Sequence, residues 1–298
     1  EIDGSRTSIQ HAGSTPIERR PYRSIMPIEP KNLRRLIIAV MLAVSSAAPA
    51  QDQSKVVPAG DLIHAVIANE LGDRVQQRKW MYAIEKRVGG QSFTEEQVET
   101  PHGPLYRVRA IDGKPLTADQ RQQDNARFGS LMHDTSQQSK LKQQYDDDEQ
   151  KLENLMRVMP AAFLYDYDGV EGKFVRLKFR PDPNYKPPTY EARVVHSLAG
   201  VVLIDAQQKR LAKLSGQIIN RVDFGYGLLG HIDNGGTIEI GRMEVGSSQW
   251  KTALINIQLS GLVVFFKTIS KQEYEIRSNF RAVAGDLSLL QASQLLAP

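Results

Sequence analysis

The chain has 298 residues, no cysteine, 41% hydrophobic and 24% charged residues, a composition typical of a globular protein rather than a disordered or disulfide-stapled one. The absence of cysteine excludes zinc fingers, thiol nucleophiles, iron–sulfur sites and an acylated N-terminal cysteine. Seven of the 38 basic and four of the 34 acidic residues lie within residues 1–50, which leaves 31 and 30 for the remainder. This nearly neutral remainder argues against nucleic-acid binding, which depends on clustered Lys and Arg.

Residues 26–50 predict a secretory signal peptide. A basic stretch that begins at Lys31 precedes an apolar run, Leu36 to Val44, and small residues follow as far as Gln51. The run is shorter than the roughly 20 residues of a membrane-spanning helix. We therefore expect cleavage before Gln51 and a soluble periplasmic product without a membrane span; a retained anchor or a buried helix is the alternative. Residues 1–25 are expected to be a non-native upstream extension.

After the leader, residues 51–60 are polar and predict a flexible tether, and residues 61–298 predict a single β-rich domain. Apolar side chains recur at helical spacing from Leu62 to Val75, which indicates an amphipathic helix over residues 61–77. The period then changes to two, and three antiparallel strands are expected before the next helical region.

A helical insertion is predicted at about 117–159. Thr117 and Gln120 have the spacing of a capping box, which starts a helix. The almost entirely polar stretch 134–140 allows either two helices with a break or one long helix with a solvated middle. Pro160 is expected to end the helical region because it lacks the N–H group that a helix interior requires.

The remainder of the chain alternates apolar and polar residues, as in EYEIRSNFR, where Tyr274, Ile276, Ser278 and Phe280 are expected to share one face. Such alternation requires one dry and one wet face. We therefore predict an α+β protein: a single strongly curved antiparallel sheet, an open or half barrel of about ten strands, with a few covering helices. A bulge is expected at Gly241, and a final short helix with Asp286 as its N-cap.

The motifs favour a non-enzymatic protein without metal or cofactor. Residues 225–230 match G-x-G-x-x-G, but the turn at Asp233 leaves no room for the helix that a dinucleotide site needs. The histidines are scattered, and the G-x-S-x-G signature of a serine hydrolase is absent. An unrecognised hydrolase, with a carboxylate site at Asp166, Asp168, Glu171 and His231, is the alternative.

The order of elements, with the segments KWMYAIEKRV, FVRLKFRPDP, VVLID and EYEIRSNFR, resembles the periplasmic lipoprotein-carrier superfamily, which has the LolA/LolB-like fold. The resemblance covers residues 61–285. It implies an open, curved antiparallel sheet that holds acyl chains against a helical lid. The long Gln-rich helical region departs from the compact lid of that family.

We expect a carrier or binder of lipid-like molecules, whose partner is a lipid or an acylated protein. The inner face of a curved sheet is wider than a few helices can fill, and burying each CH₂ group contributes about 0.8 kcal/mol. The expected lining residues, for which a filled core is the alternative reading, are Val175, Leu177, Phe179, Ile255, Ile257, Phe265, Tyr274, Ile276 and Phe280. The alternative function is a cell-envelope scaffold whose long polar helix contacts another envelope protein.

Overall fold

The computed structural model describes residues 57–76, 79–224, 230–246, 248–263 and 267–297, all of which belong to one compact unit, Ser54–Pro298. The predicted leader and most of the predicted tether lie outside the described residues. The helices are α1 (Ala59–Gln76), α2 (Ala118–His133), α3 (Thr135–Ala162), α4 (Tyr190–His196) and α5 (Leu289–Leu295). The strands are β1 (Lys79–Val88), β2 (Gln91–Val98), β3 (Leu105–Ile111), β4 (Lys114–Pro115), β5 (Phe163–Glu171), β6 (Phe174–Pro181), β7 (Leu198–Asp205), β8 (Arg210–Ile218), β9 (Val222–Phe224), β10 (Gly230–Ile232), β11 (Thr237–Gly246), β12 (Gln249–Val263) and β13 (Lys267–Val283).

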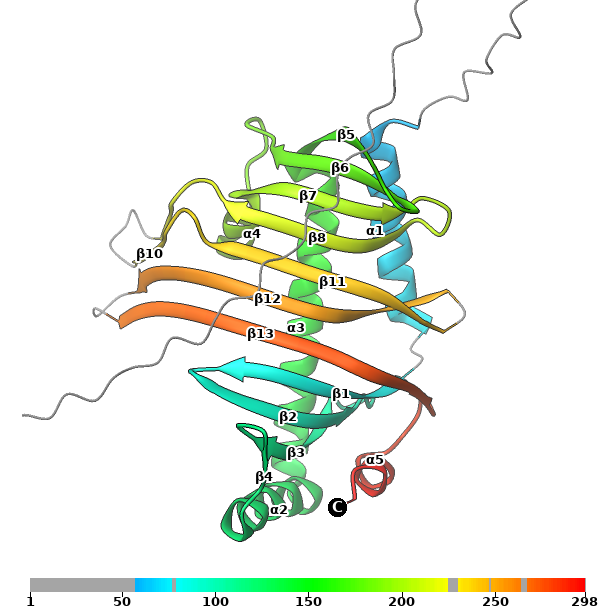
Figure 1. Cartoon of the computed structure of the whole chain (residues 1–298), viewed down its shortest axis with the longest axis vertical. Coiled ribbons are helices and arrows are strands. Elements are labelled where there is room, and N and C mark those ends of the chain that lie inside the picture. Colours follow the sequence, from blue (N-terminus) through cyan, green and yellow to red (C-terminus); the bar gives the residue numbers. More distant parts are fainter. Residues whose placement is uncertain (1–56, 77–78, 225–229, 247, 264–266, 298) are drawn as a thin grey trace, which may run out of the picture. The chain divides into compact units, whose positions relative to one another are not determined.

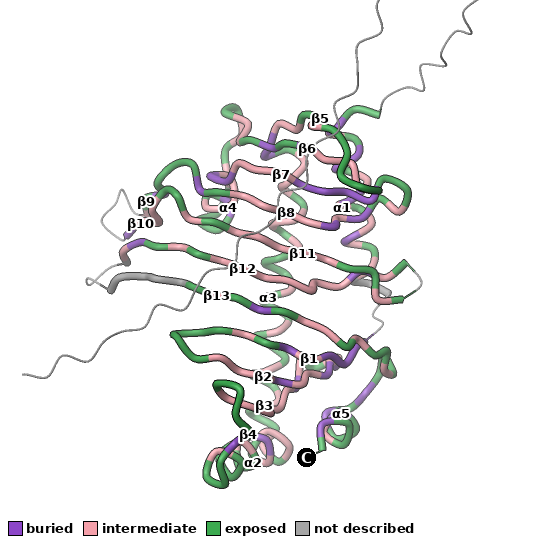
Figure 2. The backbone as a smooth tube through the Cα atoms, in the orientation of Figure 1, coloured by how far each residue is buried: buried purple, intermediate pink, exposed green. Residues whose placement is uncertain are grey.

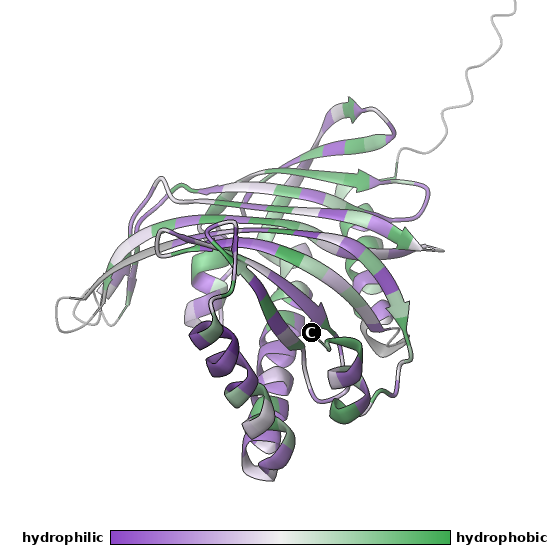
Figure 3. Ribbon diagram, turned by 60° about the horizontal axis from the view of Figure 1, so that its bottom comes forward, coloured by the Kyte–Doolittle hydropathy of each residue, from purple (hydrophilic) through white to green (hydrophobic). Residues whose placement is uncertain are grey.

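The strands form one open antiparallel sheet, as predicted, with thirteen strands in the described part of the chain (Figure 1). The order along the sheet is β4-β3-β2-β1-β13-β12-β11-β8-β7-β6-β5, and β10 pairs with β12 and β9. Strand β1, near the N-terminal end of the described chain, thus pairs with β13, the last strand in the sequence. Figure 3 shows the sheet arching over helices on its inner, concave side.

Helix α1 fills one end of the concave face. Its residues Leu62, Ile63 and Val66 are buried, which confirms the predicted apolar stripe. They pack in one cluster with Leu177 of β6 and Val202 of β7. The short run 201–204 is apolar on both sides because alternate residues of β7 join separate clusters on the two faces of the sheet.

The helical insertion is two helices with a break at Asp134. Thr117 and Gln120 form the predicted capping box, and Asp134 has an extended backbone that ends α2 while its side chain caps α3. The prediction that Pro160 ends the helix was wrong, because Pro160 lies in the last turn of α3, which continues to Ala162. In a last turn the missing N–H group removes one hydrogen bond and does not stop the two remaining residues.

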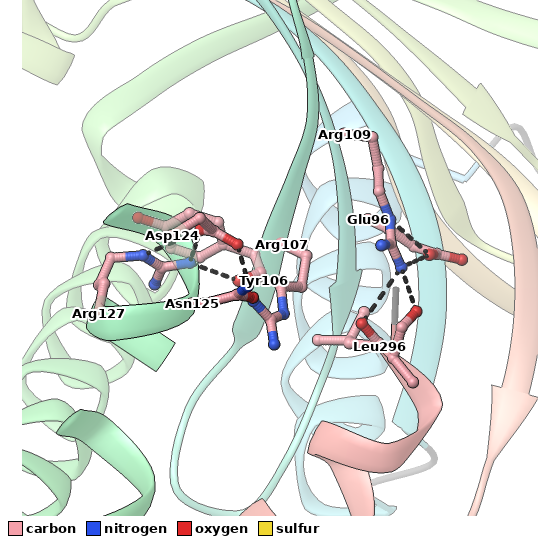
Figure 4. A network of polar contacts seen from close by, with 9 residues as sticks. Glu96, Tyr106, Arg107, Arg109, Asp124, Asn125, Arg127 and Leu296 are labelled. Carbon is pink, nitrogen blue, oxygen red and sulfur yellow. Dashed lines mark hydrogen bonds and ion pairs between the residues drawn. The ribbon is translucent and has the colours of Figure 1, made fainter. Parts of the chain in front are cut away.

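An ion pair holds α2, and hydrogen bonds to backbone carbonyls hold the end of α5, against β3 near the edge of the sheet (Figure 4). Asp124 on α2 accepts from Arg107 at 3.0 Å and from Arg127 at 2.7 Å. On the other side of β3, Arg109 donates to Glu96 and to the backbone carbonyl of Leu296 behind α5. These helices shield an edge that would otherwise be available to pair with another strand.

Two further local predictions have clear outcomes. The register of β11 and β12 shifts between Gly241 and Arg242, which confirms the bulge at Gly241. The prediction of Asp286 as the cap of the final helix was wrong, because α5 begins later, with Ser288 as its N-cap. Ser288 and Gln291 form a capping box there, which satisfies two backbone N–H groups at the start of α5.

A close approach of two strands requires glycine at position 200. A Cβ atom at Gly200 would lie 2.0 Å from the carbonyl oxygen of Ser215 on β8, which is backbone and cannot rotate away. Gly200 and Gly216 are paired directly across these strands. The absence of both side chains allows the sheet to bend sharply at this point.

We expect Gly200→Ala to lower the free energy of unfolding by about 2 to 3 kcal/mol, because the added methyl group pushes β7 from β8. Urea denaturation followed by circular dichroism measures this change. Gly129→Ala on α2 is the matched control, because no atom lies within 4 Å of its Cβ position. It should leave the protein as stable or up to about 1 kcal/mol more stable. Equal effects of the two substitutions would contradict the packing argument.

Candidate functional site

The concave face can be followed across the sheet by its strand register. Directly opposed residues of antiparallel strands point to the same side. From Leu177, buried against α1, the opposed residues are Val202, Leu214, Ile240 and Ile255 in successive strands. These side chains therefore lie on the concave face, together with every second residue on either side of them as far as the next bulge.

An isoleucine row, defined as Ile238, Ile240, Ile255 and Ile257, continues this face across β11 and β12. Ile238 packs against the α1 cluster, and the row extends away from that cluster. All four side chains are half-buried, whereas Leu177 and Val202 are almost completely buried. Figure 2 shows the same change: buried positions are frequent near α1, and intermediate positions dominate the middle strands. The row is apolar surface that folding leaves partly exposed.

Helix α3 crosses the concave side (Figures 1 and 3) but packs mainly at its two ends. Near its start, Leu141 and Tyr145 lie against Gly103 in the turn between β2 and β3. Near its end, Met159 joins the cluster around α1. All residues of α3 are described, and among them Ala162 alone is fully buried. Leu152, in the middle of the helix, is 44% exposed. Helix α3 thus crosses the sheet with most of its contacts near its two ends.

Beyond the isoleucine row the same face becomes charged. Glu275 on β13 lies directly opposite Ile255, and Lys86 on β1 lies directly opposite Glu275. Neighbouring strands are about 4.8 Å apart, so the change from apolar to charged surface takes one strand spacing. We call the three ion pairs in this region the charged cluster: Arg277 with Glu275, Lys86 with Glu95, and Lys251 with Glu99.

In each pair the cation is the more exposed partner. The Lys86 Nζ atom lies 2.8 Å from the Glu95 carboxylate, and their side chains are 27% and 5% exposed. Arg277 and Glu275 are 26% and 11% exposed, and Lys251 and Glu99, which are 2.8 Å apart, are 28% and 20% exposed. The cations are therefore more accessible to solvent than the carboxylates that they pair with.

Tyr82 adds a neutral buried hydroxyl to the cluster. Burial raises the pKa of Tyr82 well above its ordinary value, so the phenol stays protonated at neutral pH. Its oxygen accepts a hydrogen bond of 2.5 Å from the Gln97 amide. Burial lowers the pKa of the neighbouring Arg277, but Tyr82 and Glu275 outweigh this effect and raise it above the usual value. Arg277 is therefore a permanent cation.

The structure brings together only part of the predicted lining. Leu177 and Phe179 are buried core, with Val175 packed against them, so α1 already fills the space in front of them. Ile255 and Ile257 belong to the half-buried isoleucine row. Phe265 lies outside the described residues.

Tyr274 and Ile276 lie on the opposite, convex face, where they are 38% and 37% exposed. The prediction that Phe280 shares their face was wrong. A bulge between β1 and β13 includes Asn279, whose φ is +56°, and it turns Phe280 to the concave side. There its ring lies 5.1 Å from the Tyr82 ring.

Sequence reasoning missed the charged cluster. It treated Glu275 and Arg277 as a solvated face because charged residues alternate with apolar ones in this strand. The available signal was complementary charge in two other alternating segments, with Lys86 in one and Glu95 in the other. Only the pairing of these strands shows that the charges meet on the inner side.

The convex face has a shallow depression of about 500 Å³. Its rim includes Ser215, Gln217, Glu239 and Asn256, which project from β8, β11 and β12. Ala199, Ile238 and two glycines also line it, so its lining is of mixed polarity. The depression is wide and shallow, and it would leave most of an acyl chain in contact with water.

No family model, curated protein or solved structure matches this chain. Within the described ranges, the helices are all too short or too polar to cross a membrane. The same part of the chain has no group of three His, Asp or Glu side chains placed to hold a metal ion.

We expect Arg277→Gln to destabilise the protein by about 2 kcal/mol at neutral pH, because the substitution removes the ion-pair partner of Glu275, whose side chain is only 11% exposed. The double variant Glu275→Gln, Arg277→Gln should be closer to the wild type than the single variant is. Urea denaturation of the three variants measures the coupling.

A convex-face pair is the control. Lys213 and Glu239 are 43% and 31% exposed, and Lys213→Gln should cost less than about 1 kcal/mol. Additive effects of the Glu275 and Arg277 substitutions would show that burial does not couple these two charges.

Proposed function

We propose that this protein is a non-enzymatic carrier or binder of lipid-like molecules, and that the acyl chain lies along the isoleucine row beneath α3. The observation that carries the proposal is the half-buried state of this row, between an end that α1 fills and the charged cluster. Each CH₂ group that leaves water contributes about 0.8 kcal/mol, so a long chain needs few polar contacts. The LolA/LolB-like resemblance of the sequence supports the same function.

The predicted signal peptide supports a periplasmic location for this function. A carrier of acyl chains is useful in an aqueous compartment, because free chains do not dissolve there. The lipid or acylated protein that serves as cargo would be shielded from water between the sheet and α3.

The alternative function is a cell-envelope scaffold, and the surface of α3 favours it. The outer side of this helix is exposed and polar, with its own ion pairs between Lys142 and Asp146 and between Arg157 and Glu153. Such a helix presents a long surface to a partner protein. Native mass spectrometry of protein purified from an envelope extract separates the two: co-purified lipid supports the carrier, and an empty protein with a bound partner supports the scaffold.

We expect Ile255→Gln to weaken the binding of a pyrene-labelled acylglycerol by about tenfold or more, because an amide replaces apolar surface along the acyl chain. Loss of one buried isoleucine contact corresponds to about 1.5 kcal/mol or more, and 1.4 kcal/mol is a factor of ten in affinity. Fluorescence titration with the purified protein gives the dissociation constants.

Ile276→Gln is the matched control, because Ile276 lies on the neighbouring strand but on the convex face. It should leave the affinity within about twofold of the wild type. Equal losses from both substitutions, or no binding of the acylglycerol to the wild type, would overturn the proposed acyl site. Circular dichroism verifies that both variants are folded.

A further inference from the structure

We propose that the charged cluster is the head-group subsite of the same ligand site, and that it selects an amphiphile with a zwitterionic head group over one with a net negative charge. This inference rests on the proposed function and specifies its substrate class. It follows from three properties of the cluster: its position beside the isoleucine row, its charge balance, and the way its cations are exposed.

The position fixes the orientation of the ligand. Ile255 and Glu275 are directly opposed on neighbouring strands, so the end of the acyl-chain row touches the first ion pair. Lys86 follows on the next strand, and its partner Glu95 on the strand after that. A molecule whose chain lies along the row therefore places its polar end over Glu275, Arg277 and Lys86.

The charge balance opposes a simple anion. Each cation of the cluster has its own carboxylate, so the three pairs carry no net charge. Lys79 lies beside the third pair, and Glu149 is the additional negative charge near it, so the balance is unchanged. A fatty-acid carboxylate that paired with Arg277 or Lys86 would displace the glutamate that pairs with that cation. The displaced glutamate would then lack a counter-charge in a mostly buried site.

The exposure of the cations nevertheless favours a head group with anionic oxygen atoms. Arg277 uses its Nε atom for Glu275, and a guanidinium carries five N–H donors, so it can also donate to a phosphate oxygen. Lys86 lies 6.0 Å from the centre of the Phe93 ring and 5.5 Å from that of Tyr106. These rings already contact the cations Lys86 and, at Tyr106, Arg127, so the ammonium end of a zwitterion would meet the carboxylates of the cluster instead. Such a head group satisfies both signs of charge and adds no net charge.

The test compares four amphiphiles with the same oleoyl chain, each below its critical micelle concentration, by isothermal titration calorimetry with the purified chain. They are lysophosphatidylcholine, which is zwitterionic, oleate and lysophosphatidylglycerol, which are anionic, and monooleoylglycerol, which is uncharged. We expect lysophosphatidylcholine to bind about tenfold more tightly than either anion at low salt, and more tightly than monooleoylglycerol.

Glu275→Gln should reduce the preference for lysophosphatidylcholine over oleate to about threefold or less, because the cluster then has a net positive charge. Glu239→Gln is the matched control: Glu239 is also ion-paired, but it lies on the convex face. It should leave the preference unchanged. A retained tenfold preference in Glu275→Gln, or a change in Glu239→Gln, would contradict the assignment of the cluster.

The outcomes separate the two proposals. Anions that bind as tightly as lysophosphatidylcholine would overturn the head-group inference and leave the acyl site intact. Equal affinity for monooleoylglycerol and lysophosphatidylcholine would also overturn it, because the cluster would then recognise no charge. Failure of all four amphiphiles to bind would overturn the proposed function itself, and the head-group inference with it.

Discussion

The helices cover only part of the concave face of the sheet, and this incomplete coverage determines most of the structure. The sheet, with thirteen strands among the described residues, presents more inner surface than α1, α4 and the ends of α3 cover. Where α1 packs, Leu177 and Val202 are buried completely, as in any protein core. A few strands further, Ile240 and Ile255 have the same orientation but remain half-buried. The difference between a core and a candidate binding surface therefore lies in what covers the face, and much less in the type of side chain on it.

The sequence predicts the elements of this fold well because their signals are local. The capping box at Thr117, the apolar stripe of α1 and the glycine at the β11 bulge each act within a few residues. The alternation in each strand also indicates which residues share a face. It does not indicate which face is the inner one, because that depends on strands far away in the sequence. Tyr274 and Ile276 were assigned to the inner face for this reason, although they lie on the convex side.

Charged residues of a strand usually lie on its outer face and apolar residues on its inner face. Strand β13 does not follow this rule. Glu275 and Arg277 lie on the concave side because β1 and β2 supply Lys86 and Glu95 beside them. Burying an isolated charge is very unfavourable, whereas burying one beside an opposite charge is much less so. An apolar cluster of the same volume would hold the sheet together at least as well. The retention of ion pairs at the margin of an apolar row is therefore easier to explain by recognition of a polar group than by stability.

The construction of α3 is consistent with a ligand that passes beneath it. An isolated helix of 28 residues in water needs support along its length, and ion pairs between residues four apart, such as Lys142 with Asp146, supply part of it. Contacts with the sheet add to it: the Tyr145 ring lies 5.8 Å from Lys79 Nζ on β1. Separating the middle of α3 from the isoleucine row would break few buried contacts, whereas separating α1 from Leu177 would expose a complete core cluster. Segments with few buried contacts open at the lowest free energy, so the proposed acyl site and its route of access would both lie where the inner face is least covered.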